Sequence, residues 1–121
     1  MNNYKDLKLW QKSVDLAVGT YKVTNSFPKE EMYGLTSQIK RSAVSIPSNI
    51  AEGYERDSHK EQARFYRIAK GSCGEARTQI YIGIEAEYID RDTGLTWVEE
   101  YRQLAAMLAA MIKKKELGAR S

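Results

Sequence analysis

Apolar residues recur in this chain at alternating steps of three and four positions, and this spacing appears in four separate segments. In the first segment the series is Leu7, Trp10, Val14, Ala17 and Tyr21. Residues with this spacing share one face of an α-helix, whereas a half-buried strand alternates at every second position. The period therefore predicts an all-α fold.

Four helices are expected, at about residues 6–26, 30–56, 58–89 and 93–116. The connections between them are short, and short connections make consecutive helices antiparallel neighbours. The chain is therefore predicted to be a single domain, over residues 1–121, with the topology of an up-down-up-down four-helix bundle. The stretch 79–84 (QIYIGI) can also be read as a strand, but it is in phase with the third helical stripe.

Local signals set the expected helix ends. Pro28 disfavours helical geometry at the residue before it and so separates the first two helices. Ser58, with Glu61 three positions later, forms a capping-box pattern for the third helix. Asp92 or Thr93 is the expected cap of the fourth.

Pro47 lies inside the second predicted helix, where it removes a backbone donor. The apolar period continues in phase on both sides of it, through Ala43, Ile46 and Ile50. A kink at Pro47 is therefore expected rather than a break. In the third helix, Gly71, Ser72 and Gly74 lower helix propensity but would allow a neighbouring helix to approach closely.

A second apolar stripe is present on the first helix. Leu9, Leu16 and Val23 repeat every seven residues, on a different face from Leu7 and Val14. Further apolar residues lie outside the main stripes of the last two helices: Ile82, Ile89, Val98, Ala105 and Ile112. Scattered apolar residues are ordinary on a surface, but the heptad spacing favours a contact between subunits. A homo-oligomer that uses Leu9, Leu16 and Val23 is therefore predicted.

The net charge is only +3, but the charges are sorted along the predicted bundle. One end gathers Lys5, Lys8, Lys12, Arg56, Lys60, Arg64, Arg67, Lys113, Lys114 and Lys115. The opposite end gathers Glu30, Glu31, Glu85, Glu87, Asp90, Asp92, Glu99 and Glu100. A few charges of the other sign accompany each group. The molecule is therefore expected to be dipolar.

The basic group contains cations that helix stability does not explain. Lys113–Lys115 lie at a helix C-terminus, where the dipole favours cations. Lys60 and Arg64 lie near a helix N-terminus, where it disfavours them, and with Arg67 they form one self-repelling face. His59 and Tyr66 lie nearby and are candidates to stack on bases. Charge runs are often only solvated surface, but this one predicts binding of RNA or DNA.

Signals for catalysis are sparse. His59 is the only histidine and Cys73 the only cysteine, so a paired Glu-x-x-His di-iron site and a thiolate metal cluster are excluded. Cys73 is expected to pack inside the third helix, and Glu52 with Glu55 is an ordinary surface pair. No Gly-rich phosphate loop is present. We expect no enzyme activity, cofactor or metal.

Location is predicted from what the chain lacks. No run of about 18 apolar residues is present, so no membrane span is expected. The first residues lack an apolar signal core, and a single cysteine suits a reducing compartment. A cytoplasmic protein is therefore expected.

Residues 41–53 (RSAVSIPSNIAEG) form a distinctive run, and residues 4–12 and 27–39 extend the same pattern. The chain resembles the four-helix-bundle family that is encoded in intervening sequences of bacterial 23S ribosomal RNA genes, sometimes labelled S23 ribosomal proteins. The resemblance implies an all-α bundle and a ring-shaped homopentamer. It also implies a likeness to accessory proteins of diversity-generating retroelements, which bind a reverse transcriptase and nucleic acid through basic surfaces.

The residues that carry the resemblance are Arg41, Pro47, Asn49, Glu52 and Gly53. A structural or subunit-contact role is expected for them, including a link from Arg41 to Glu52 through the serines between them. The leading hypothesis is an oligomeric helical protein that presents basic ends to RNA or DNA. The alternative is a protein–protein module for a polymerase-like partner.

Overall fold

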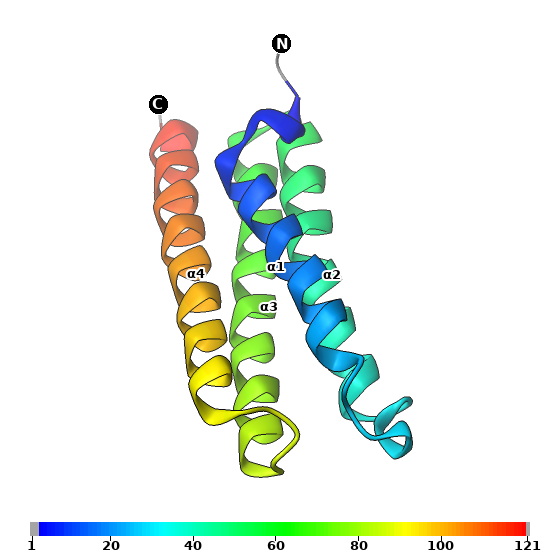
Figure 1. The fold of residues 1–121 in the computed structure, drawn as a ribbon. Helices are drawn as coiled ribbons and strands as arrows, with labels where there is room; N and C mark the ends of the chain where they lie inside the picture. Colours follow the sequence, from blue (N-terminus) through cyan, green and yellow to red (C-terminus); the bar gives the residue numbers. More distant parts are fainter. Residues whose placement is uncertain (1–2, 121) are drawn as a thin grey trace.

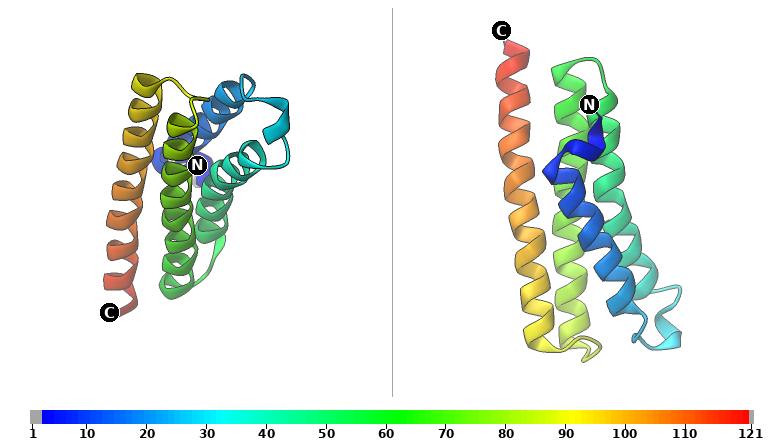
Figure 2. Two further views of the ribbon diagram at one scale, coloured as in Figure 1. Left: turned by 90° about the horizontal axis from the view of Figure 1, so that it is seen from below. Right: turned by 45° about the horizontal axis from the view of Figure 1, so that its top comes forward.

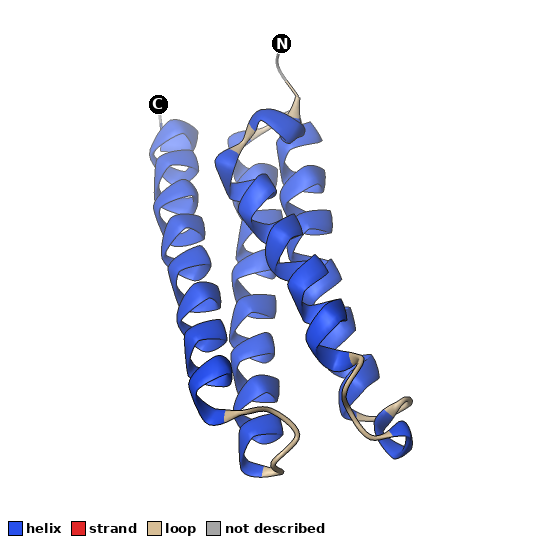
Figure 3. Ribbon diagram, viewed as in Figure 1, coloured by secondary structure: helices blue, strands red, loops and turns tan. Residues whose placement is uncertain are grey.

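The computed structural model describes residues 3–120, and the regular structure in this range is entirely helical (Figure 3). Two short 3-10 helices, η1 (Tyr4–Asp6) and η2 (Lys29–Glu31), accompany four long α-helices. The long helices are α1 (Lys8–Thr24), α2 (Leu35–Glu55), α3 (His59–Glu85) and α4 (Arg91–Arg120). The all-α prediction is confirmed, and residues 79–84 lie within α3.

The chain reverses direction at each connection, as the colours of Figure 1 show. The N-terminal start of α1, the α2–α3 turn and the C-terminal end of α4 lie at one end of the molecule, seen from a second direction in the right-hand view of Figure 2. The α1–α2 and α3–α4 connections lie at the other end. α3 packs extensively on α2 and α4, whereas α1 packs mainly on α2 and contacts α4 over a shorter stretch.

The end of α3 differs from the prediction. It ends at Glu85 rather than near Ile89, because Glu87 adopts a left-handed conformation with φ of 65°. The amide of Tyr88 donates to the carbonyl of Gly83 at 2.8 Å, and the amide of Glu87 donates to that of Ile84 at 3.0 Å. This pattern is a Schellman motif, which usually has glycine at the left-handed position.

Side-chain caps explain the starts of α3 and α4. The Ser58 hydroxyl accepts from the amide of Glu61 at 3.1 Å, so the predicted cap of α3 is confirmed. For α4 the predicted cap was wrong: the Asp90 carboxylate accepts from the amide of Thr93 at 3.1 Å. α2 begins at Leu35 rather than near Glu30, because the intervening residues form η2 and a turn.

α2 is continuous from Leu35 to Glu55 with Pro47 inside it, so no break occurs there. Its residues Ile39, Ile46 and Ile50 are completely buried. They pack in one hydrophobic cluster that draws residues from all four long helices, including Ile80 of α3 and Leu104 of α4.

The buried face of α1 was predicted wrongly. Leu9 and Leu16, expected on an outward stripe, are 5% and 8% exposed, and Val23 packs partly buried against the core. Tyr21, expected inside, is 44% exposed. The outward positions expected for Ile89, Val98, Ala105 and Ile112 were also wrong, because all four are buried.

Polar residues account for the error on α1. Ser13, Thr20 and Thr24 are buried beside Leu9 and Leu16. Each hydroxyl donates to a carbonyl of its own helix: Ser13 to Trp10 at 2.7 Å, Thr20 to Leu16 at 2.9 Å and Thr24 to Thr20 at 2.9 Å. A Ser or Thr satisfied in this way can be buried at little cost.

Candidate nucleic-acid interface

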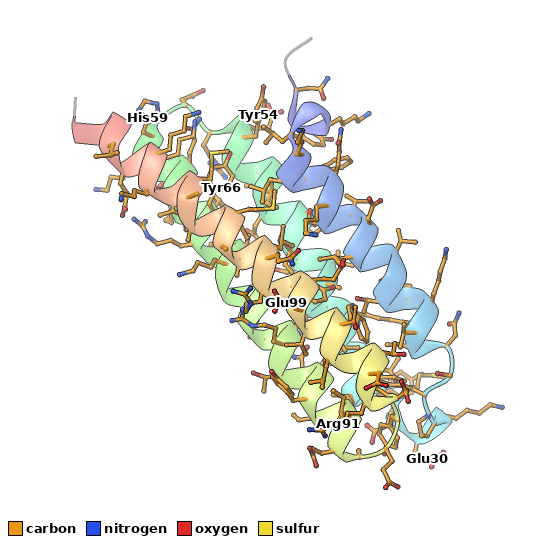
Figure 4. The ribbon with its side chains drawn as sticks, turned by 60° about the vertical axis from the view of Figure 1, so that its left-hand side comes forward. Glu30, Tyr54, His59, Tyr66, Arg91 and Glu99 are labelled. Carbon is orange, nitrogen blue, oxygen red and sulfur yellow. The ribbon has the colours of Figure 1, made fainter. Side chains whose placement is uncertain are left out.

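The ten cations predicted to form a basic group come from one end of the molecule. They lie in the first turns of α1 with η1, around the α2–α3 turn, and in the last turns of α4. Eight of the ten are exposed, and Lys12 and Lys115 are half-buried. We call this set of ten residues the basic end. In Figure 4, His59 and Tyr54 mark this end, and Glu30 and Arg91 mark the opposite one.

The acidic group is less concentrated than predicted. Glu30, Glu31, Glu85, Glu87, Asp90 and Asp92 lie around the two connections of the opposite end. Glu99 lies farther along α4 (Figure 4) and pairs with Arg102, and the next residue, Glu100, lies 4.0 Å from Lys12 of α1. The charge is therefore sorted by end, with a band of ion pairs between the ends.

The arginines of the basic end have carboxylate partners. Arg56 lies 2.7 Å from Glu52, Arg64 lies 3.1 Å from Glu61, and Arg67 pairs with Glu116 of α4. The hydrogen bond from Arg64 holds the pKa of Glu61 below its usual value. Two of the three cations on the self-repelling face predicted for α3, Arg64 and Arg67, are thus paired within the chain. Because these pairs are exposed, they contribute little stability and a polyanion can compete for them.

Phe65 organises two of these arginines, which the sequence did not predict. The guanidinium carbons of Arg56 and Arg64 lie over its ring, 4.6 Å and 4.4 Å from the centroid. The prediction that Tyr66 stacks on bases was wrong, because Tyr66 is only 1% exposed. Burial also raises the pKa of its phenol. Adjacent helix residues differ in direction by about 100°, so the aromatic near the surface is Phe65. The sequence feature that could have pointed to Phe65 is its position directly after Arg64.

His59 joins the start of α3 to the end of α4. A methyl group built on Gly118 would lie 2.7 Å from Nδ1 of His59, so the ring lies directly against this glycine. His59 is itself exposed. It therefore lies within the basic end where the start of α3 meets the end of α4.

The residues of the family motif connect α2 to α3. The Asn49 amide donates to the carbonyl of Ser45 at 2.8 Å and to its hydroxyl at 3.0 Å, and the Ser72 hydroxyl donates to Ser45 at 2.9 Å. The predicted link from Arg41 to Glu52 was wrong, because Glu52 pairs with Arg56 and Arg41 is exposed. Pro47 is half-buried, beside an outer groove between α1 and α2.

That groove has a volume of about 440 Å³ and is lined by Val14, Ala17, Val18, Tyr21, Val44 and Pro47. Lys40 lies over the ring of Tyr21, 4.8 Å from its centroid. A second exposed apolar area on α3 contains Tyr81 and Ile82, which are about half exposed. These two surfaces, and not Leu9 and Leu16, are apolar and accessible.

Cys73 is completely buried, and burial raises its pKa to about 12. It is therefore a packing residue in the chain as folded, since a reactive thiol needs access and a lowered pKa. Among the side chains that the structure describes, no three of His, Cys, Asp or Glu are placed to hold a metal ion together. None of the helices within residues 3–120 is long and apolar enough to cross a membrane.

Comparison with known proteins places these features in context. The family model of the 23S rRNA-intervening sequence protein matches residues 5–110. A crystal structure of a protein with unknown function from the S23 ribosomal protein family of Bacteroides thetaiotaomicron VPI-5482 is similar, with a TM-score of 0.78 and 25% sequence identity. The similarity covers 87% of this chain and 98% of that one. No curated protein matches the sequence.

Proposed function

The chain belongs to the 23S rRNA-intervening sequence protein family, and on that premise we propose that it is a non-enzymatic, self-assembling helical protein whose basic end binds RNA or DNA. The observation that carries the proposal is the convergence of exposed cations from η1, α1, the α2–α3 turn, α3 and α4 at one end of the molecule. Phosphate neutralisation by lysine and arginine is the main source of affinity for nucleic acid.

Lys60 supports this function over a purely structural one. It lies in the first turn of α3, two residues after the Ser58 cap, where the helix dipole disfavours a cation. It is also exposed, beside the exposed and paired Arg64. A cation in this position lowers helix stability, so a role in binding an anion accounts for it.

Phe65 supports the same function. By holding the guanidiniums of Arg56 and Arg64 over its ring, it limits the conformations of two long side chains. Less conformational entropy is then lost when these arginines bind phosphate. The planar guanidinium also offers paired donors that match phosphate oxygens.

Self-assembly is proposed through the two accessible apolar surfaces. The groove at Val18, Tyr21 and Val44 and the area at Tyr81 and Ile82 are different patches on different helices. Two different complementary patches make a head-to-tail contact, which closes into a ring when the rotation permits. The pentamer that the family resemblance implies is one such ring. Sedimentation at micromolar concentration tests it: an oligomer that Val44→Glu dissociates is expected, and a wild-type monomer contradicts it.

Binding to the basic end is tested with a fluorescently labelled single-stranded RNA and the DNA of the same sequence. The double variant Lys60→Glu, Lys114→Glu should bind either strand at least about tenfold more weakly, since two phosphate contacts become repulsive. The matched control is Lys22→Glu, Lys29→Glu, which changes the net charge equally on exposed lysines near the opposite end. Equal weakening by both pairs would show that only net charge matters and would refute a site at the basic end.

A protein partner that resembles a polymerase is the second candidate, supported by the same exposed cations. Pulldowns distinguish this candidate from direct binding of nucleic acid. They use the wild type and the variant Lys60→Ala, Arg64→Ala, Arg67→Ala, before and after nuclease treatment. A retained protein that survives nuclease and is lost in the variant, without any direct binding of labelled RNA or DNA, would favour this candidate.

A further inference from the structure

A groove runs along the outer surface between α3 and α4, beginning within the basic end. Its volume is about 880 Å³. Its lining residues come from the middle of α3, between Arg67 and Arg77, and from α4 between Ala105 and Leu117. The sequence did not predict this groove, because Lys70 and Arg77 lie farther along α3 than the residues that were assigned to the basic end.

The groove is strongly cationic. Arg67, Lys70 and Arg77 line it from α3, and Lys113 lines it from α4. The only carboxylate among the lining residues is that of Glu116, which is already paired with Arg67. A ligand that fills the groove therefore meets an excess of positive charge.

Two glycines keep the groove open. A methyl group on Gly71 would have no neighbour within 4 Å, and one on Gly74 would meet only Arg77 at 3.8 Å. Packing of the chain therefore does not require glycine at either position. Glycine lowers helix stability, and here it leaves room above the helix backbone. Ala105 and Ala109 provide the facing side from α4.

The dimensions suit one strand of nucleic acid. Arg67 and Arg77 are separated by about 15 Å along the helix axis, so a strand that follows the groove passes these cations with more than one phosphate. Packed helices lie only about 8–10 Å apart, so a groove between two of them is too narrow for a duplex. The lining residues include no aromatic side chain on which a base would stack.

We propose that the α3–α4 groove binds the sugar–phosphate backbone of a single-stranded RNA or DNA, which continues into it from the basic end. The inference rests on the proposed nucleic-acid function and adds the strand type and the path. Because the contacts are to phosphate and not to base edges, binding in the groove depends little on sequence.

The test fills the groove without removing any charge. In Gly71→Leu the added Cβ atom meets no atom within 4 Å, and a residue of higher helix propensity replaces glycine, so the variant is expected to fold. The matched control is Gly19→Leu on α1, where an added methyl group also has no neighbour within 4 Å. Both variants are measured with a labelled single-stranded RNA, beside the Lys60→Glu, Lys114→Glu variant, and their folding is checked by circular dichroism.

Gly71→Leu is expected to weaken RNA binding about tenfold or more, whereas Gly19→Leu leaves it unchanged. Unchanged binding in Gly71→Leu, with weak binding in the Lys60→Glu, Lys114→Glu variant, would overturn the groove and leave the basic end standing. Absence of binding by the wild type would overturn both. The proposal would also be overturned if Gly71→Leu binds RNA normally but sediments differently, or if it loses a protein partner that resists nuclease treatment. Either result would assign the groove to a protein helix.

Discussion

Gly53 of α2 lies against the ring of Tyr66 of α3, so closely that a methyl group on Gly53 would be 2.8 Å from Cε1 of Tyr66 and 3.2 Å from the carbonyl oxygen of Gln62. Tyr66 is fully buried and the carbonyl belongs to the helix backbone, so neither can move away easily. The close spacing of the two helices therefore depends on the absence of a side chain at this position.

Gly53→Ala is expected to lower the free energy of unfolding by about 1–3 kcal/mol, because overpacking outweighs the gain in helix propensity. Urea unfolding followed by circular dichroism measures the change. Gly71→Ala is the control, since its methyl group has open space, and it should raise stability by about 0.5–1 kcal/mol. Equal stabilisation by both substitutions would show that Gly53 is not sterically required.

Glu87, which ends α3 with φ of 65°, is the subject of a second prediction. A left-handed conformation costs a residue with a side chain about 1–2 kcal/mol. Glu87→Gly removes this strain, and the net gain is expected to be about 1 kcal/mol after the greater freedom of the unfolded chain is counted. The control is Ala86→Gly, at a right-handed position with φ of −79°, where glycine should bring no gain. A loss of stability in Glu87→Gly would contradict the prediction.

A third prediction concerns the buried hydrogen bond between Thr20 Oγ1 of α1 and the hydroxyl of Tyr101 on α4, at 2.8 Å. Thr20→Val should lower the free energy of unfolding by about 1–3 kcal/mol, because it leaves the phenol poorly satisfied inside the core. In the double variant Thr20→Val, Tyr101→Phe, the free energy of unfolding should fall by less than the sum of its decreases in the two single variants. Additive losses in this double-mutant cycle would show that the pair does not interact.

Alkaline pH should destabilise the chain through Cys73 and Tyr101. Burial raises both pKa values to about 12, from 9.0 for the thiol and 10.0 for the phenol. Above pH 9 the unfolded chain loses these protons while the folded chain keeps them, so the unfolded state binds fewer protons and stability falls as pH rises. The stabilisation is complete below the unfolded pKa values and is lost toward pH 12.

The free energy of unfolding should fall by up to about 1.4 kcal/mol per pH unit for each group that is ionised only in the unfolded chain. Urea unfolding at several pH values between 8 and 11 measures it. Tyr101→Phe removes one of the two groups and should flatten the profile above the usual phenol pKa of 10.0. A profile that Tyr101→Phe leaves unaltered would exclude Tyr101 as a source.

The helical period predicted four long helices, since isoleucines and leucines of α2 and α4 repeat on the faces that the core covers. It failed on α1, because Ser13, Thr20 and Thr24 resemble surface residues but satisfy their hydroxyls within their own helix. The end of α3 was missed because the left-handed residue there is Glu87 and not the expected glycine.

The candidate site was predicted in outline only. Helix direction places the cations at one end, and this follows from the order of the segments along the chain. Which aromatic lies at the surface, Phe65 or Tyr66, depends on a rotation of about 100° that the period does not resolve. The α3–α4 groove depends on how two helices leave Gly71 and Gly74 uncovered, which requires the packed structure.

The most direct test of the account is the salt dependence of affinity for a labelled single-stranded RNA, measured between about 50 mM and about 200 mM salt. Each phosphate neutralised on a single strand adds about −0.7 to the slope of log K against log salt. Contacts from the basic end and the groove together predict a slope of about −3 or steeper, and a shallower slope for Lys60→Glu, Lys114→Glu. An affinity that does not change with salt, or no binding at the lowest salt, would contradict binding of nucleic acid through phosphate contacts at the basic end.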